Sequence, residues 1–436
     1  MRVGIVGAGI TGLTAAYELA KRGHLVEVFE ASDKVGGLAS GFKDEGWEWH
    51  LERFYHHWFA SDYAVLALLK ELGLREKAFF PRPITSIWYR GEAYPFDSPW
   101  AVLKFPHLSL KSKMRFGLVG LYLRLTTKWE PLEKHTAHDW LSRRMGNEAY
   151  SVLWKPLLEG KFGPIYQEVN MAWFWARLHK RSPRLGYFEG GFQAFADALA
   201  SKVEEMGGII HLKSPVKQVK REEDGRLEVI STAGVKKFEA VLATCSPKVL
   251  ATIVKDFPDD YLEYLAKLRF LGAVVLILAL KHPLTSGHYW INLPKGEFPF
   301  LALVEHTNYI SPKHYGGDHI VYLGDYVPTT HEYFRLSKEK LEELFIPHLS
   351  RFNPAFKPDW IRKTWLFREP YAQPVPGVNQ SKLVPTIETP IPGLYWASMH
   401  HVYPWDRGTN YSVELGKRAA EKIAGVRPNF VGCSLH

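Results

Sequence analysis

The sequence predicts an α/β fold with two domains, and three observations support this prediction. The chain opens with a β-branched run, a glycine-rich turn and a stretch with helical spacing of apolar residues, which is the pattern of a strand, a turn and a helix. At 436 residues the chain is long enough for two hydrophobic cores. Hydrophobic residues at 46% and charged residues at 23% are typical of a soluble globular protein.

The first element is a strand joined to a helix by three glycines. Arg2–Val6 has the composition of a short strand, Gly7–Gly12 reads Gly-Ala-Gly-Ile-Thr-Gly, and Leu13–Arg22 has helical periodicity. In this pattern the first glycine permits a tight turn, the second lets a pyrophosphate approach the backbone, and the third lets the helix pack close to the strand. Because the free N–H groups of a helix N-terminus attract phosphate, the segment predicts a Rossmann-like dinucleotide-binding domain.

An acidic residue and a second glycine-rich loop follow, and they favour one dinucleotide. Glu30 ends the second expected strand, Leu25–Phe29, and lies 18 residues after Gly12, where it is placed to accept hydrogen bonds from a ribose diol. The loop Val35–Gly41 comes where a nicotinamide-binding domain usually continues into another helix. These two loops favour FAD, and the expected contacts are Gly7, Gly9, Ile10, Thr11, Gly12, Glu30, Ala31, Gly36, Gly37 and Leu38.

Three blocks of the sequence resemble the flavin amine oxidase superfamily, which includes protoporphyrinogen oxidases, carotenoid desaturases and, more distantly, UDP-galactopyranose mutases. The first block is the opening just described. The second begins at Glu189-Gly190-Gly191 and ends at Ser246-Pro247, and the third begins at Pro392-Gly393 and ends in the last helix. The resemblance implies that the second block returns the chain to the FAD-binding domain, with Val216 meeting the adenine, and that the third closes over the flavin.

The three blocks imply a discontinuous arrangement of domains. The expected Rossmann-like FAD-binding domain comprises residues 1–80, 186–268 and 380–436, and the inserted α+β substrate-binding domain comprises residues 81–185 and 269–379. We expect the first insertion to be helical and Trp-rich. The second should mix strands at 273–280 and 319–323 with a helix from Lys338 to about Ile346, capped by Ser337 and ended by Pro347.

The segment from Ser98 to Trp129 contains no aspartate or glutamate. It carries six basic residues among many apolar ones: Lys104, Lys111, Lys113, Arg115, Arg124 and Lys128. This pattern is typical of a core helix with a solvated basic edge, or of a helix that lies on an anionic membrane and draws a lipid-like substrate inward. Peripheral membrane contact through residues 104–129 is therefore one of two interpretations of this segment.

Ionisable and aromatic residues are mixed in the segment GWEWHLERFYHHWFASD, residues 46–62. Such a mixture suits a pocket that holds a flat ring and moves protons. In the superfamily that the chain resembles, this position runs along the flavin ring. The resulting catalytic candidates are His50, Arg53 and His56, together with Arg407. A metal site is not expected, because adjacent histidines such as His56 and His57 rarely point at one ion.

The chain turns into its last helix at Arg407-Gly408-Thr409-Asn410. In the superfamily, the N–H groups of this turn face the N1 and C2 carbonyl edge of the flavin, so Gly408, Thr409 and Asn410 are expected to contact the cofactor. Gly408 has no Cβ to obstruct the ring, and the positive end of the helix dipole favours a reduced, anionic flavin. Arg407 adds a charge there or pairs with Asp406 or Glu414.

Two departures from the family pattern bear on the reaction. Amine oxidases usually carry a lysine inside one strand of the substrate domain, whereas the matching strand here, Gly272–Leu280, is apolar until Lys281. Many relatives have Gly-Asp where this chain has Ser398-Met399. We therefore expect an FAD-dependent oxidoreductase, protoporphyrinogen oxidase-like or desaturase-like, that passes a hydride from an apolar or aromatic small-molecule substrate to flavin N5.

Three alternatives to this function stay open. One is a redox-neutral enzyme of the UDP-galactopyranose mutase type, in which the basic residues Arg177, Lys180, Arg181 and Arg184 would grip a diphosphate. The others are an amine oxidase and a flavin-bound protein without turnover. The net charge of +9 is not accompanied by a run of like charges or a nucleic-acid motif, so nucleic acid is not an expected partner.

Two cysteines, Cys245 and Cys433, form neither a disulfide framework nor a metal-ligand spacing. Together with the lack of a cleavage pattern after the apolar start, this predicts a cytoplasmic protein, with membrane association as the open alternative. The sequence does not indicate an oligomeric state.

Overall fold

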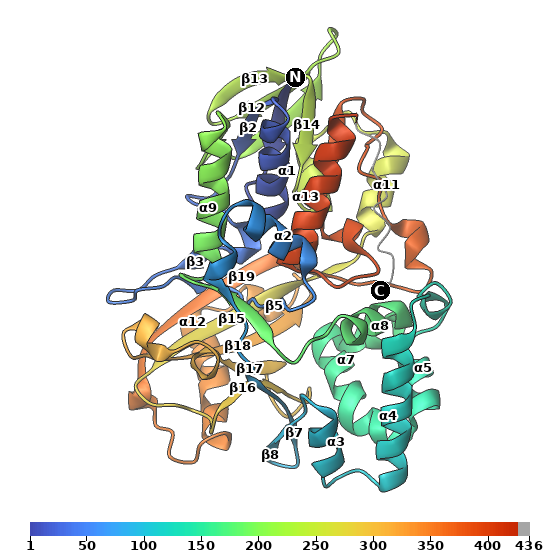
Figure 1. Cartoon of the computed structure of the whole chain (residues 1–436), viewed down its shortest axis with the longest axis vertical. Coiled ribbons are helices and arrows are strands. Elements are labelled where there is room, and N and C mark those ends of the chain that lie inside the picture. The colour runs from blue at the N-terminus through green and yellow to red at the C-terminus, as the bar shows by residue number, and fades with distance from the viewer. Residues whose placement is uncertain (426–436) are drawn as a thin grey trace.

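The computed structural model describes residues 1–425 and contains a parallel sheet, a mixed sheet and a helical unit (Figure 1). The parallel sheet has five strands in the order β10-β2-β1-β14-β20. These strands come from three distant parts of the chain: β1 (Arg2–Val6), β2 (Leu25–Phe29), β10 (Ile209–His211), β14 (Ala240–Ala243) and β20 (Leu394–Trp396). The predicted α/β class is therefore correct, and all three expected blocks contribute a strand to one sheet.

Helices cover one face of the parallel sheet and a second, smaller sheet covers the other. The helices that lie together along it in Figure 1 are α1 (Ile10–Lys21), α9 (Phe192–Glu205) and α13 (Thr409–Ile423). α13 packs closely on α1, since a Cβ at Gly416 would lie 2.6 Å from the carbonyl oxygen of Thr11. The opposite face packs on an antiparallel sheet formed by β11 (Val216–Arg221), β12 (Leu227–Ser231) and β13 (Gly234–Phe238).

The mixed sheet has seven strands in the order β19-β15-β18-β17-β16-β7-β8. Their bounds are β19 (Ile361–Pro374), β15 (Phe270–Leu280), β18 (His319–Val327), β17 (Ala302–Glu305), β16 (His288–Asn292), β7 (Ile84–Tyr89) and β8 (Glu92–Pro95). Alternate residues of β15 divide between two cores. Val275 and Ile277 join the core shared with the parallel sheet, while Leu276 and Leu278 face the core beneath α12 (Lys338–Phe345).

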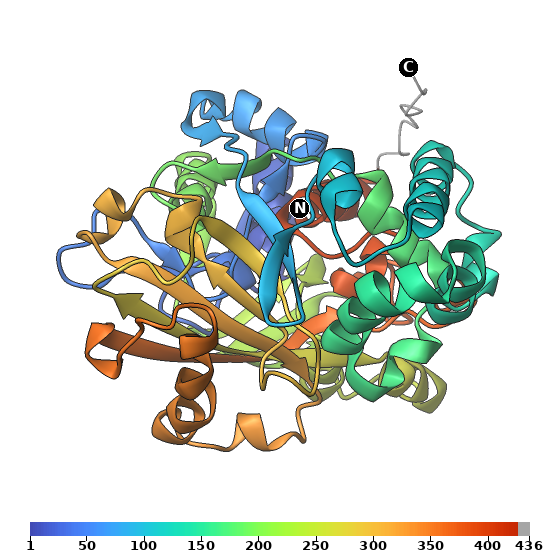
Figure 2. The ribbon, with the colours of Figure 1, turned by 90° about the horizontal axis from the view of Figure 1, so that it is seen from below.

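The helical unit lies beside the mixed sheet, as the view from below shows (Figure 2). Its principal helices are α3 (Pro99–Lys104), α4 (Leu110–Leu125), α5 (Ala137–Met145), α7 (Lys155–Phe162) and α8 (Met171–His179). Trp173, Phe174 and Trp175 of α8 are buried in its centre. The remaining α-helices of four or more residues within residues 1–425 are α2 (Tyr63–Glu71), α10 (Pro247–Ile253) and α11 (Asp259–Lys267). Between residues 1 and 425, no helix is long and apolar enough to cross a membrane.

The expectations for the two insertions are met in part. The helix expected from Lys338 is confirmed, with the hydroxyl of Ser337 accepting a hydrogen bond from the Lys340 amide at 3.3 Å. The expectation that residues 81–185 are simply helical is wrong at its start, because β7 and β8 form a hairpin that joins the mixed sheet. The signal was the two-residue turn Arg90-Gly91, in which both residues have positive φ, as hairpin turns require.

The exact domain boundaries stay a prediction. The last part of the third expected segment, residues 426–436, lies outside the described residues, and so does Cys433.

Candidate functional site

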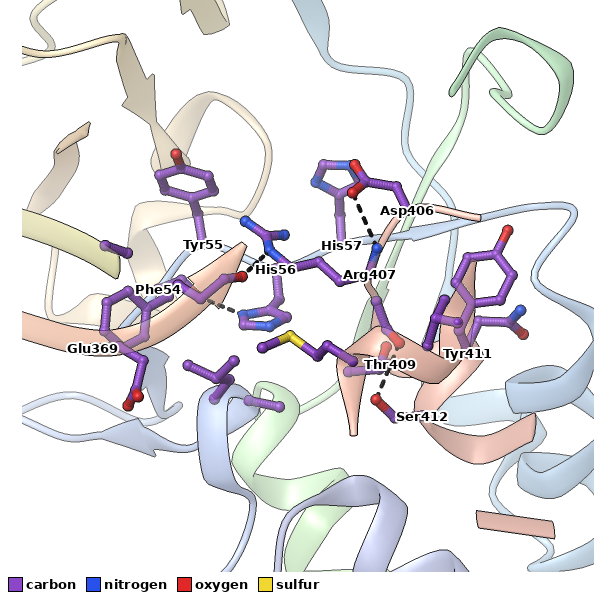
Figure 3. Close-up of a pocket in the computed structure, with 18 of the residues that line it drawn as sticks. Phe54, Tyr55, His56, His57, Glu369, Asp406, Arg407, Thr409, Tyr411 and Ser412 are labelled. Carbon is purple, nitrogen blue, oxygen red and sulfur yellow. Dashed lines mark hydrogen bonds between the residues drawn. The ribbon is translucent and has the colours of Figure 1, made fainter. Parts of the chain in front are cut away.

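A cavity of about 500 Å³ is bounded by the parallel sheet, the mixed sheet and the helical unit. Its lining includes both glycine turns, the segment Phe54–His57, and the loop and first turn of α13. Further lining residues come from β15, β16, β18, β19, α7 and α8. Figure 3 shows part of this lining, with His56 and Arg407 near the centre and Thr409 and Tyr411 at the start of α13. One cavity thus joins the expected cofactor turns to the second sheet.

The two glycine turns approach each other closely, and an added Cβ would be crowded at Gly7, Gly12 and Gly37. Gly7 has φ +101°, and a Cβ there would lie 2.6 Å from the Thr244 hydroxyl. A Cβ at Gly12 would lie 2.0 Å from the carbonyl oxygen of Gly7, so α1 begins directly against β1. Gly9 and Gly37 approach each other, since a Cβ at Gly37 would lie 3.1 Å from the Gly9 Cα. The turns therefore line the cavity with backbone, which we call the cradle, and the uncapped N–H groups at the start of α1 belong to it.

Two helices begin at this cavity without a side-chain cap. The N-cap of α1 is Gly9 and that of α13 is Gly408, and neither helix start is satisfied by a capping side chain. The side chains of Thr409 and Asn410 are engaged elsewhere. Thr409 accepts from the indole N–H of Trp58 at 2.5 Å, and Asn410 accepts from the backbone of α2 at 3.1 Å. The free N–H groups of both helices are thus available to a ligand with anionic or carbonyl oxygens.

Glu30 ties the first turn to the segment that follows β2. One of its carboxylate oxygens accepts from the Ala8 amide at 2.7 Å, and the other accepts from the amide and the hydroxyl of Ser32, both at 2.9 Å. Glu30 also lines the cavity. This arrangement of a backbone cradle, two uncapped helix N-termini and a fixed acid fits FAD, whose phosphates need N–H donors and whose ribose hydroxyls need an acceptor.

Most of the expected cofactor residues line the cavity, and three do not. Those that do are Gly7, Gly9, Ile10, Thr11, Glu30, Gly36, Gly37, Leu38, Gly408, Thr409 and Asn410. Gly12 instead packs against Gly7, and Ala31 is exposed. Val216 is the first residue of β11, and its half-buried side chain packs against the core shared by the parallel sheet and the β11–β13 sheet. Its contact with the adenine stays a prediction.

The four catalytic candidates separate into two pairs. His56 and Arg407 line the cavity, whereas His50 and Arg53 do not. The backbone of His50 is held by Gly190, and the guanidinium of Arg53 lies 5.8 Å from the centre of the Phe367 ring. The two-residue strand Leu51–Glu52 lies between them in the chain. The reaction proposed for the cavity therefore involves His56 and Arg407.

His56 is half-buried, and its imidazole is neutral at neutral pH. Burial lowers its pKa to about 4, with Arg407 acting in the same direction and the bond to Phe54 opposing it. Nδ1 of the ring lies 2.5 Å from the carbonyl oxygen of Phe54 (Figure 3). Because a carbonyl only accepts, Nδ1 carries the hydrogen and Nε2 is left as an acceptor. His56 thus presents an unprotonated nitrogen at neutral pH.

A charged cluster around Asp406 was missed by the sequence reasoning. The carboxylate accepts from Arg177 at 2.6 Å, from Lys161 at 3.3 Å and from the indole of Trp173 at 3.2 Å. Burial acts to raise the pKa of Asp406, but the charges of Lys161, Arg177 and Arg407 outweigh it and hold the pKa below its ordinary value. The sequence offered no signal, because α7, α8 and the last loop meet only in the folded chain.

Two more cations line the cavity without an acidic partner. Within residues 1–425, neither Lys180 nor Arg181 has a carboxylate oxygen within 4 Å, and both line the cavity next to Arg177. We call these three residues the cationic wall. Burial lowers the pKa of the neighbouring His57 to about 3, and the charges of Arg181 and Arg177 add to this. This side of the cavity is positively charged and suits an anionic group.

Glu52 lies fully buried outside the cavity and carries a pH-dependent cost. Burial raises its pKa from 4.5 to about 7, opposed by hydrogen bonds from the Phe192 amide at 2.7 Å and the Tyr187 hydroxyl at 2.8 Å. A raised carboxyl pKa means that the folded state binds the proton more tightly. Its contribution to stability is therefore complete below pH 4.5 and is lost as the pH rises through about 7.

The variant Glu52→Gln should remove this pH dependence. Relative to the variant, the wild type is expected to lose about 3 kcal/mol of unfolding free energy between about pH 4 and pH 8. Urea unfolding of both proteins at several pH values measures the difference. A difference that is constant with pH would contradict the raised pKa.

Comparison with known proteins identifies a matching family and several similar proteins. The model of a family described as flavin containing amine oxidoreductase matches residues 10–424. A 15-cis-phytoene desaturase from Synechococcus elongatus is 23% identical, over 97% of this chain and 96% of the relative. A crystal structure of a putative protoporphyrinogen oxidase from Exiguobacterium has a TM-score of 0.77 at 18% identity, covering 97% of this chain and 98% of that one. Reduced UDP-galactopyranose mutase has a TM-score of 0.76 at 17% identity, with 97% and 95% covered.

Because these two solved structures are only 18% and 17% identical to this chain, their similarity concerns the fold alone. The family match, in contrast, covers nearly all of the described residues, including the end of the first glycine turn, the second glycine turn and the start of α13. It agrees with the fit of the cradle to FAD, the cofactor expected from the sequence, and with an FAD-dependent oxidoreductase. This chain belongs to the flavin containing amine oxidoreductase family.

Proposed function

We propose that this oxidoreductase removes a hydride from an apolar or aromatic small molecule, as a protoporphyrinogen oxidase-like or desaturase-like enzyme. The observation that carries the proposal is the continuity of the cavity. It begins at the glycine turns and the N-terminus of α13 and continues to a set of apolar and aromatic side chains from the mixed sheet and its loops: Val275, Tyr289, Trp290, Leu293 and Leu301. Such a lining binds flat or apolar molecules by burying their surface.

Different residues of the cavity have different roles in the proposed reaction. Bound FAD supplies a hydride acceptor. The uncapped N-terminus of α13 and the guanidinium of Arg407 place positive charge on the cavity, which favours negative charge that develops on a bound ligand. A substrate that loses a hydride and forms a double bond also loses a proton. His56 Nε2, which is free to accept, is the candidate base for that proton.

The variant His56→Gln tests this role. Glutamine can still donate to the Phe54 carbonyl but has no basic nitrogen, so kcat should fall about 10²- to 10⁴-fold while flavin content stays unchanged. The pH profile of the variant should also lack the limb that His56 contributes to the wild-type profile. His138→Gln is a matched control, because His138 is half-buried in the helical unit outside the cavity lining. Equal kcat in wild type and His56→Gln would remove His56 from the reaction.

The proposed reaction class is tested with the purified yellow protein under anaerobic conditions. Addition of protoporphyrinogen or phytoene should bleach the flavin absorbance without added reductant, and air should restore it. Bleaching by putrescine but by neither of these would move the assignment to amine oxidation. Protein that contains no flavin after reconstitution would overturn the proposal.

A redox-neutral reaction of the UDP-galactopyranose mutase type is the second candidate, and the cationic wall favours it. Arg177 shares one carboxylate with Lys161, and Lys180 and Arg181 have none within 4 Å between residues 1 and 425. Guanidinium groups in this setting suit the diphosphate of a nucleotide sugar. Conversion of UDP-galactopyranose that requires prior reduction by dithionite would support this candidate, and activity without reductant would count against it.

A further inference from the structure

Helix α4 presents a row of large apolar side chains to solvent. Leu110, Met114, Leu118, Leu121 and Leu125 recur at spacings of three and four residues, which places them on one face of the helix. Their exposed fractions lie between 55% and 71%. We call these five residues the α4 stripe. In the adjoining helix α3, Trp100 and Leu103 are exposed as well.

The opposite face of α4 already holds the helix to the protein. Leu123 is fully buried, and Phe116 and Val119 pack against the core of the helical unit. Arg115 donates to the carbonyl oxygen of Arg144 at 2.6 Å. The helix is therefore apolar on both faces, although a surface helix normally has a polar outer face. Contiguous exposed apolar surface of this kind marks an interaction site.

The charged side chains of the segment that carries the α4 stripe, residues 98–129, are of one sign. Residues 98–129 contain no acid, and their six basic residues form no ion pair within 4 Å with any carboxylate between residues 1 and 425. Lys104 lies over the Trp100 ring at 5.3 Å, and Lys113 donates to the carbonyl oxygen of Leu103 at 2.7 Å, which holds α3 against α4. Glu148 contacts the start of α4, where its carboxylate accepts hydrogen bonds from the hydroxyls of Ser109 and Ser112.

We propose that the α4 stripe and its basic flank dock on a membrane surface that contains anionic lipids. The helix would lie in the plane of the interface, with the aliphatic side chains among the acyl chains and the lysines and arginines at the phosphates. A second copy of the chain is a poorer occupant. A two-fold contact would place this segment against itself, and without any acid the six cations would face six others.

The surface is connected to the cavity through the end of α4. Arg124 donates to the carbonyl oxygen of Arg181 at 3.4 Å, and the indole of Trp175 donates to the carbonyl oxygen of Thr126 at 2.9 Å. Arg181 belongs to the cationic wall. The docking surface therefore lies against the segment that forms one side of the cavity, and an amphiphile leaving the membrane would meet that segment first. This last step rests on the proposed function, whereas the docking itself does not.

Vesicle flotation with the flavin-loaded protein tests the docking. Wild type should float with phosphatidylcholine vesicles that contain phosphatidylglycerol, and float less with phosphatidylcholine alone or at high salt. The double variant Leu118→Glu, Leu121→Glu should lower the bound fraction at least about tenfold. Leu25→Glu is the matched control, because Leu25 is 64% exposed on the parallel sheet and should leave binding unchanged.

The outcomes separate the alternatives. Flavin content and melting temperature of the double variant should equal those of the wild type, because both leucines are exposed. Failure of the wild type to float, or equal flotation of the double variant, would overturn the proposal. A dimer in light scattering that is lost in the double variant, without any flotation, would assign the stripe to a second copy instead. None of these results depends on which substrate the enzyme uses.

Discussion

Replacing Gly9 with valine is expected to abolish the retention of FAD while the protein remains folded. Affinity should fall at least about a hundredfold, which corresponds to about 3 kcal/mol. Gly9 has φ −70°, a conformation open to any residue, and the nearest protein atom to an added Cβ is the Gly37 Cα at 3.9 Å. The chain therefore tolerates a side chain at this position. The valine methyl groups would instead occupy the cavity where the pyrophosphate is expected to approach the backbone.

Gly12 provides the contrast that makes this result interpretable. A Cβ at Gly12 would lie 2.0 Å from the carbonyl oxygen of Gly7, so Gly12→Ala must displace α1 from β1 and should lower the melting temperature as well as the flavin content. The flavin-to-protein absorbance ratio and the thermal unfolding of both variants measure the two effects. Gly9→Val protein that purifies with full flavin would show that the cofactor does not approach this turn.

The cofactor cradle could be predicted because its signal is local. Three glycines at fixed spacing, a strand before them and a helix after them lie within the first 22 residues, and the structure places Gly9 and Gly37 back to back. The same holds for the helix after Ser337, where the cap is one residue from the helix. Short-range turn chemistry decides both. The hairpin at Arg90-Gly91 carried an equally local signal that the expectation of a helical insertion overlooked.

The polar half of the cavity could not be predicted in the same way. Asp406 and Lys161 are 245 residues apart, and neither segment contains a pattern that predicts contact with the other. His50, Arg53 and His56 occupy one short segment of similar composition, yet only His56 lines the cavity. In a segment this short, the direction in which each side chain points depends on its tertiary contacts. Catalytic candidates drawn from such a segment need the fold before they can be separated.

Asp406→Asn is expected to destabilise the protein by about 3–5 kcal/mol, the cost of leaving buried charge without its partner. The asparagine cannot neutralise Lys161 and Arg177, which both bind this carboxylate, and Arg407 adds to their repulsion. Because the pKa of Asp406 is held below its ordinary value, its contribution is present above the ordinary carboxyl range and is lost only as the pH falls through the lowered value. The gap between wild type and variant should therefore stay constant from neutral pH down to mildly acidic pH.

Urea unfolding of the flavin-loaded proteins measures this difference, with Asp224→Asn as the control. Asp224 also pairs with an arginine, at 2.6 Å, but on the surface, where removing the pair should change stability little. If the two variants unfold alike, the cluster around Asp406 is solvated and does not constrain the cavity. If Asp406→Asn is unstable and phosphate in the buffer restores part of the loss, an external anion has replaced the missing carboxylate. Arg177 belongs both to the cluster around Asp406 and to the cationic wall. Recovery of stability by phosphate would therefore show that the cationic wall, which the mutase-type reaction requires, binds an anion.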